Sequence, residues 1–198
     1  MKNHPSRRSA GFTLVELLVV IAIIAVLAGA GFSAGLAAIQ RAKKTTALAT
    51  CTAIEAAVNN FYTEYGAMPV GSSTADVTYD TKANLDFVTA LLGTETSTTP
   101  QNTRGIKFLS LKDGKAKGTG GFNGAVYNTA GTTLLGVFDP WGGTYSVRLD
   151  GDYDEAVTVQ PKAATSSVKL NSRRAAAWSD GADGVTATGK STDDVKTW

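Results

Sequence analysis

The feature that most constrains this chain is an apolar run that continues into an amphipathic pattern without a proline. Residues 17–32 contain no polar side chain, and no proline occurs between residues 12 and 65. After Ile39, apolar side chains recur at three- and four-residue steps, the spacing of one helix face. The stripe consists of Leu48, Cys51, Ile54, Val58, Phe61, Tyr62 and Tyr65. The pattern predicts one helix of about 80 Å that ends at Gly66, before Pro69.

The apolar part of this helix has the properties of a membrane segment. Residues 12–39 exceed the roughly 20 residues that a helix needs to cross a bilayer, and Arg7 and Arg8 would keep the N-terminus in the cytoplasm. Glu16 lies within the segment, where a charged side chain costs roughly 2.5 to 3.5 kcal/mol and so usually has a partner. A secretory signal peptide removed after Ala30, or an uncleaved anchor, would leave Glu16 unexplained.

Composition excludes several functions for the remainder of the chain. Three of the 19 Lys and Arg residues precede Gly11, which leaves 16 basic against 17 acidic side chains, so nucleic-acid binding has no support. The single histidine, His4, also precedes Gly11, and this argues against His-dependent catalysis. The single cysteine, Cys51, cannot form a disulfide within the subunit and is expected to be a small buried apolar residue. We therefore expect a protein that is not an enzyme.

Residues 11–24, GFTLVELLVVIAII, match the type IV prepilin signature over its whole length. The chain thus resembles precursors of the type IV pilin and type II secretion pseudopilin superfamily. The resemblance implies that a membrane-embedded prepilin peptidase cuts between Gly11 and Phe12 and methylates the new amine of Phe12. It also implies that Glu16 pairs with the Phe12 amine of a neighbouring subunit, which would neutralise a charge in low dielectric and fix the register of assembly.

The sequence predicts an α+β fold of the pilin type, with a long N-terminal helix packed on a small antiparallel β-sheet. We expect a leader (1–11), a transmembrane and filament-core helix (12–39), an amphipathic half (40–66), a variable loop region (67–122), and a sheet with an acidic loop (123–198). A short helix is predicted in the loop region, with Asn84 as cap and Gly93 as stop. Its buried face would be formed by Leu85, Val88, Leu91 and Leu92. Residues 93–105 and 114–121 are predicted to be loops.

Alternating apolar residues predict strands in the last third of the chain. The alternation is clear at 145–149, 157–159 and 168–170. Just before the first of these, Asp139-Pro140-Trp141-Gly142 has the composition of a tight turn. The segment from Asp139 to Tyr145 also resembles a stretch of the major pseudopilins of type II secretion systems.

The acidic segment from Trp178 to Trp198 resembles the calcium loop of the same branch. The resemblance implies Asp183, Asp193 and Asp194 as Ca²⁺ ligands, with Asp180 as an extra candidate. Interleaved Asp and Gly suit the six to eight oxygen ligands that calcium takes. The segment lacks the Glu-Gly-Gly-Glu centre usual in the family, and a solvated acidic loop without metal is the alternative.

A second acidic run, residues 150–155, has Asp at the first, third and fifth positions of an EF-hand loop. The template fails at its sixth position, Glu155, and at its twelfth, Pro161. We therefore expect a hairpin loop here.

Together these features predict a structural subunit of a type II secretion pseudopilus, polymerised through its N-terminal helix. Its expected partners are further copies of itself, other pseudopilins, prepilin peptidase and the inner-membrane assembly platform. The expected location is the inner membrane, with a cytoplasmic N-terminus and a periplasmic head. A type IV pilus pilin for adhesion, motility or DNA uptake is one alternative, and a membrane-anchored monomeric calcium-dependent binding module is another.

Overall fold

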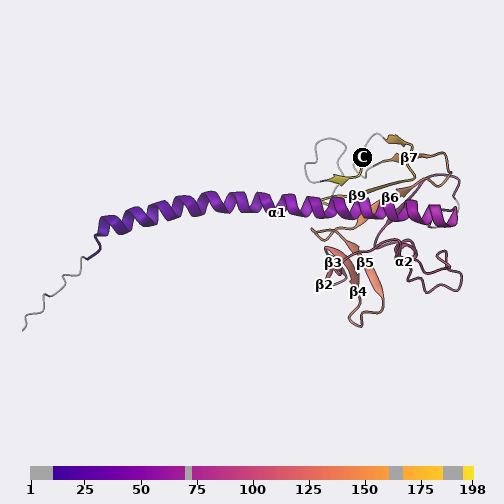
Figure 1. Cartoon of the computed structure of the whole chain (residues 1–198), viewed down its shortest axis with the longest axis horizontal. Helices are drawn as coiled ribbons and strands as arrows, with labels where there is room; N and C mark the ends of the chain where they lie inside the picture. The colour runs from indigo at the N-terminus through magenta and orange to yellow at the C-terminus, as the bar shows by residue number, and fades with distance from the viewer. Residues whose placement is uncertain (1–10, 70–72, 161–166, 185–193) are drawn as a thin grey trace, which may run out of the picture. The chain divides into compact units, whose positions relative to one another are not determined.

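The computed structural model of this 198-residue chain describes residues 11–69, 73–160, 167–184 and 194–198. Residues 1–41 and 42–198 form two compact units, and each is described by itself. Helix α1 (Leu14–Tyr65) contributes residues to both (Figure 1). It ends as predicted at Gly66, which has a φ of 68° and donates its N–H to the Tyr62 carbonyl at 2.8 Å. This left-handed conformation strongly favours glycine, and it stops the helix.

The first unit contains the apolar part of α1. Among the residues that the structure describes, no helix combines the length and the apolar character needed to cross a membrane. The membrane segment predicted for residues 12–39 stays a prediction.

The second unit is built around the amphipathic part of α1. Four residues of the predicted stripe, Cys51, Ile54, Val58 and Phe61, are at most 1% exposed. Tyr62 and Tyr65 pack against this core and are partly buried. The burial confirms the helix face and the expected apolar environment of Cys51.

Leu48 was predicted in the stripe, and this was wrong because its exposed fraction is 43%. The buried face instead begins at Ala47, four residues before Cys51. Leu48 lies about 100° further round the helix than Ala47, so it faces away from the core despite its size.

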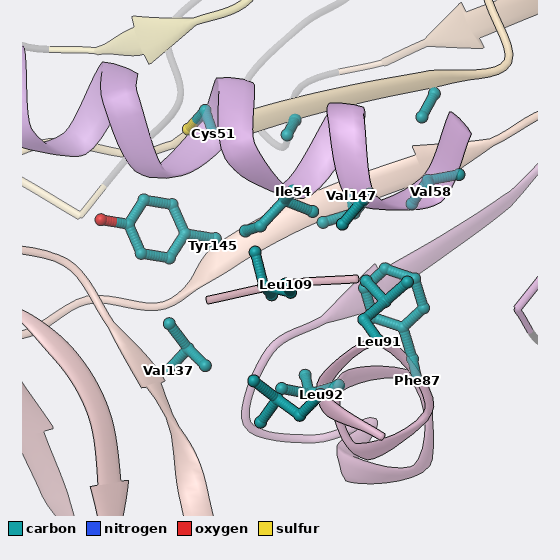
Figure 2. Packing of buried hydrophobic residues seen from close by; sticks show 14 of the residues in the cluster. Cys51, Ile54, Val58, Phe87, Leu91, Leu92, Leu109, Val137, Tyr145 and Val147 are labelled. Carbon is teal, nitrogen blue, oxygen red and sulfur yellow. The ribbon is translucent and has the colours of Figure 1, made fainter. Parts of the chain in front are cut away.

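A four-stranded antiparallel sheet covers this helix face. Its strands are β1 (Val77–Asp80), β6 (Tyr145–Leu149), β9 (Ala175–Ser179) and β10 (Val195–Lys196), in the order β1-β6-β9-β10. Figure 2 shows Ile54 and Val58 of α1 beside Val147 of β6. The α+β fold with a long helix on antiparallel strands agrees with the prediction.

Strand β9 is buried on both faces, which explains its run of small side chains. Ala175 and Ala177 belong to the core under α1, whereas Ala176 and Trp178 belong to a second cluster. The second cluster includes Val157 and Val159 from β7 (Ala156–Val159), which pairs with β8 (Val168–Asn171). The four-stranded sheet is therefore a layer between α1 and the β7–β8 hairpin.

Two further hairpins complete the described part of the head. Strand β4 (Gly124–Tyr127) pairs with β5 (Leu134–Phe138), and β2 (Lys115–Lys117) pairs with β3 (Gly120–Phe122). The second of these hairpins lies in the segment predicted as a loop, 114–121, and that prediction was wrong. Gly118, with a φ of 56°, forms the tight turn that lets the flanking residues pair.

Helix α2 (Leu85–Leu92) forms where the sequence predicted it and ends at Gly93, with a φ of 69°. Val88, Leu91 and Leu92 are buried as expected, while Leu85 is only partly buried. Phe87 and Ala90 are also buried, so the apolar face is wider than predicted. Asn84 precedes the helix but caps nothing, because its side-chain oxygen accepts the Asp80 N–H at 2.9 Å.

Candidate assembly and metal-binding sites

The predicted cleavage junction lies directly before the first turn of α1. Gly11, Phe12 and Thr13 are exposed and non-helical, and the helix begins at Leu14. A bond that a peptidase cuts must be accessible and outside regular secondary structure, and this junction meets both conditions. The basic residues before Gly11, Arg7 and Arg8, lie outside the described residues.

Glu16 closes a capping box with Thr13 at this end of the helix. Its Oε2 accepts the Thr13 N–H at 2.9 Å and the Thr13 hydroxyl at 2.6 Å. The Glu16 N–H in turn donates to Thr13 Oγ1 at 3.3 Å. Thr-x-x-Glu is the sequence signature of this motif, in which two N-terminal amides of a helix are satisfied reciprocally.

Large apolar side chains are exposed at Phe12 and along the first part of α1. Their exposed fractions range from 44% at Val20 to 81% at Leu14. The set comprises Phe12, Leu14, Val15, Leu17, Leu18, Val19, Val20, Ile21, Ile23, Ile24, Val26, Leu27, Phe32, Leu36 and Ile39. A single subunit leaves this surface uncovered, and a continuous apolar surface of this kind marks a membrane or protein interaction site.

The turn at Asp139 connects β5 to β6, and the buried carboxylate of Asp139 holds the turn together. Asp139 is 1% exposed, and its Oδ1 accepts the N–H groups of Trp141, Gly142 and Gly143 at 2.8, 2.8 and 2.9 Å. Gly142 has a φ of 101°, and a Cβ there would lie 2.6 Å from the Phe122 ring. The turn predicted from Asp-Pro-Trp-Gly is therefore present, and it requires both Asp139 and Gly142.

The same carboxylate reaches the start of the predicted calcium loop. Asp139 Oδ2 accepts the Ser179 hydroxyl at 2.6 Å, and Ser179 Oγ accepts the Gly181 N–H at 3.2 Å. The turn and the last residue of β9 are thus tied together in the interior. Sequence reasoning treated the two segments separately.

The two arms of the calcium loop are brought together by strand pairing. Ser179 of β9 pairs with Val195 of β10, so Asp180 and Asp194 lie next to this pair, one after the end of β9 and the other before the start of β10. The Asp194 side chain is 3% exposed and forms an ion pair with Lys196 Nζ at 3.1 Å. Asp183 is exposed on the first arm, and Asp193 lies outside the described residues.

The residues present fit a cation in part. The Asp194 carboxylate is almost fully buried and lies near Asp180 in the strand register, and carboxylate oxygens are the ligands that Ca²⁺ takes. Within the described ranges, the carboxylates that lie close enough together to share a metal ion are not those of the predicted calcium loop. They are Asp76, Asp150 and Asp152.

This other grouping lies where the EF-hand-like run was recognised. Residues 150–155 form the expected loop between β6 and β7, and Asp76 joins them from just before β1. One carboxylate oxygen from each of Asp76, Asp150 and Asp152 lies within 4.8 Å of the others. Sequence reasoning missed Asp76, since only the β1–β6 pairing brings it there.

Protein groups already engage these carboxylates. Asp150, which is 1% exposed, accepts the N–H groups of Asp154 and Glu155 at 3.1 and 3.0 Å. Asp76 accepts the Thr158 N–H at 2.6 Å. Burial raises the pKa of the Asp150 carboxyl. These contacts hold the 150–155 loop together and tie β7 to the segment before β1, and an acidic cluster alone does not define a metal site.

Glu55 links α1 to the C-terminal strands. Its Oε1 accepts the Ala177 N–H at 3.2 Å and the Thr197 hydroxyl, and lies 3.4 Å from the Arg173 guanidinium. Burial raises the pKa of this carboxyl, against the opposing effects of Thr197 and Arg173. No local sequence pattern predicts this contact, because Glu55 lies 122 residues before Ala177.

Residues 6–32 match the family model described as the prokaryotic N-terminal methylation motif. The matched range includes the Gly11–Phe12 junction, the capping box and most of the exposed apolar surface. It supports a type IV pilin-like prepilin, a class of structural rather than enzymatic proteins. The motif also implies processing by prepilin peptidase and assembly into a filament. Neither the curated proteins nor the solved structures give a match to this chain.

Proposed function

We propose that this protein is a structural subunit of a type II secretion pseudopilus. The observation that carries the proposal is the methylation motif, which contains an exposed cleavage junction. The junction is followed by an apolar helix surface that one subunit leaves uncovered. After cleavage, these surfaces pack against one another and form the filament core. The Glu16 carboxylate of one subunit pairs with the methylated Phe12 amine of the next, so that neither charge is buried alone.

Before assembly, the apolar segment holds the subunit in the inner membrane, with the head in the periplasm. Prepilin peptidase, an inner-membrane assembly platform, other pseudopilins and further copies of this chain are the partners that such a subunit requires. Growth of the filament then drives protein secretion.

The pseudopilus is favoured over a surface pilus by the head. The buried Asp139 turn and the acidic loop after Ser179 both resemble the major pseudopilins, and the hydrogen bond between Asp139 and Ser179 joins these two segments. A type IV pilus pilin is the second candidate, because the methylation motif is common to both.

We also propose that the acidic loop holds Ca²⁺. Asp183, Asp193 and Asp194 are the proposed side-chain ligands, with Asp180 as an additional one. The pairing of β9 with β10 supports this assignment, since it brings the two arms of the loop together. Bound calcium would supply the cross-link that a chain with one cysteine lacks.

The test of the filament proposal combines mass analysis with filament yield. The mature chain should start at N-methylated Phe12, and Glu16→Ala should be cleaved normally but yield no sheared filaments. Glu155→Ala, which removes an acidic side chain that is 71% exposed on the head, is the matched control and should assemble normally. A chain that starts at Gly31 would indicate an ordinary signal peptide, and normal filament yield from Glu16→Ala would contradict the role in assembly.

A further inference from the structure

We propose that Thr13 is a positioning residue for Glu16. In the unassembled subunit it holds the Glu16 carboxylate toward Phe12, the first residue of the mature chain. This inference rests on the proposed function, because it concerns how Glu16 is prepared for the Phe12 amine of a neighbouring subunit. The evidence is the set of three hydrogen bonds between the two residues.

All atoms of this capping box lie after the Gly11–Phe12 bond. The Thr13 amide, the Thr13 hydroxyl and the Glu16 side chain are therefore retained when the leader is removed. The same arrangement serves the precursor and the mature subunit. Cleavage adds only a cationic amine, one residue before Thr13.

The arrangement also determines where the carboxylate points. Both Thr13 donors bond Oε2, at 2.9 and 2.6 Å, and neither bonds Oε1. A side chain with several rotatable bonds is thereby folded back along the helix axis toward residue 12. Oε2 is held within the subunit, and Oε1 accepts from neither Thr13 donor.

Two physical effects make this arrangement useful for assembly. A carboxylate in an apolar environment is costly unless donors surround it, and Thr13 supplies two donors before any neighbour arrives. A side chain already held in its binding conformation also loses less entropy on pairing. Loss of the hydroxyl should therefore weaken assembly without removing the charge on which assembly depends.

The experiment compares Thr13→Val with Thr13→Ser and Glu16→Ala in the full chain, with sheared filament measured per cleaved subunit. Thr13→Val keeps the shape and removes the hydroxyl, and it should reduce the filament yield by about tenfold or more. Thr13→Ser restores the hydroxyl and should give a yield within about twofold of the wild type. Helix content of each variant is measured by circular dichroism. If Thr13 only started the helix, the serine and valine variants would give the same filament yield whenever their helix contents were equal.

The outcomes separate this inference from the proposed function. Normal assembly of Thr13→Val beside failed assembly of Glu16→Ala overturns the role of Thr13 alone, and normal assembly of both overturns the proposed function. If Thr13→Val is not cleaved, nuclear magnetic resonance of the labelled precursor in detergent micelles decides. The Thr13 amide shift should follow the protonation of Glu16, and an amide shift that ignores it overturns the inference.

Discussion

The carboxylate of Asp139 accepts a hydrogen bond of 2.6 Å from the hydroxyl of Ser179, forty residues further along the chain. The same carboxylate holds three backbone N–H groups of its own turn. One buried side chain thus connects the β5–β6 turn to the end of β9, where the acidic loop begins. Its removal should affect both regions together.

Replacement of Asp139 by alanine should destabilise the head by about 3 kcal/mol or more, because several buried donors would lose a charged acceptor. Asp139→Asn keeps one carbonyl oxygen for the turn and should cost less, since the Ser179 hydroxyl can reorient to accept from the amide. Urea unfolding of the three proteins measures this difference. Equal losses for Asn and Ala would show that the hydrogen bonds of the turn contribute little.

Calcium should raise the melting temperature of the wild-type chain relative to a sample with chelator, because an ion bound only by the folded state stabilises that state. Asp194→Asn should abolish this rise, since Asp194 is a proposed ligand that is almost fully buried.

Asp152→Asn is the matched control for calcium binding. It alters the second acidic cluster by the same chemical change and should leave the calcium-dependent rise intact. A rise lost in Asp152→Asn and kept in Asp194→Asn would assign the ion to the Asp76, Asp150 and Asp152 cluster. No rise in the wild type would remove calcium from the proposed function.

Glu55 should give the head a measurable pH dependence. Burial raises the pKa of its carboxyl above the ordinary glutamate value, so the folded state binds the proton more tightly than the unfolded state does. The free energy of unfolding contributed by Glu55 is therefore fully present below the unfolded pKa, about 4.3, and is lost as the pH rises through the folded pKa.

Glu55→Gln removes this titration while its carbonyl still accepts from the Ala177 N–H. Its stability relative to the wild type should rise with pH across the same window and then become constant. Urea unfolding at a series of pH values checks this expectation. Parallel stability profiles for the two proteins would show that Glu55 has the same pKa in both states.

The buried face of α1 can be tested with two apolar residues of the helix, one buried and one exposed. Ile54→Ala should cost about 2 to 5 kcal/mol, since Ile54 is 1% exposed and packs on β6. Leu48→Ala should cost only about 0.5 kcal/mol, because Leu48 is 43% exposed. Similar losses for the two variants would mean that Leu48 has a partner in the assembled protein.

The elements with strong local signals could be predicted from the sequence. The long helix and its end at Gly66, helix α2, and strands β6, β7 and β8 follow from periodicity and from glycine. The cleavage junction and Glu16 could also be predicted, because the prepilin signature is contiguous in the sequence. Its capping box is contiguous as well, and Thr13 followed three residues later by Glu16 could have predicted it.

Other features depend on contacts between distant residues. Strand β9 shows no alternation, because Ala175 and Ala177 face one cluster while Ala176 and Trp178 face another, so both faces are apolar. Asp76 reaches Asp150 only through the pairing of β1 with β6, and Glu55 reaches Ala177 only once β9 lies on the helix. No local sequence pattern encodes these long-range contacts.

The position of β9 has a consequence for the time course of folding. Glu55 and its partner Ala177 are 122 residues apart, and the helix face that forms the core is made long before the strand that covers it. Folding dominated by such non-local contacts is slow. During that interval the apolar stripe of α1 is available to other chains, so newly made subunits should be most prone to aggregation before β9 is in place.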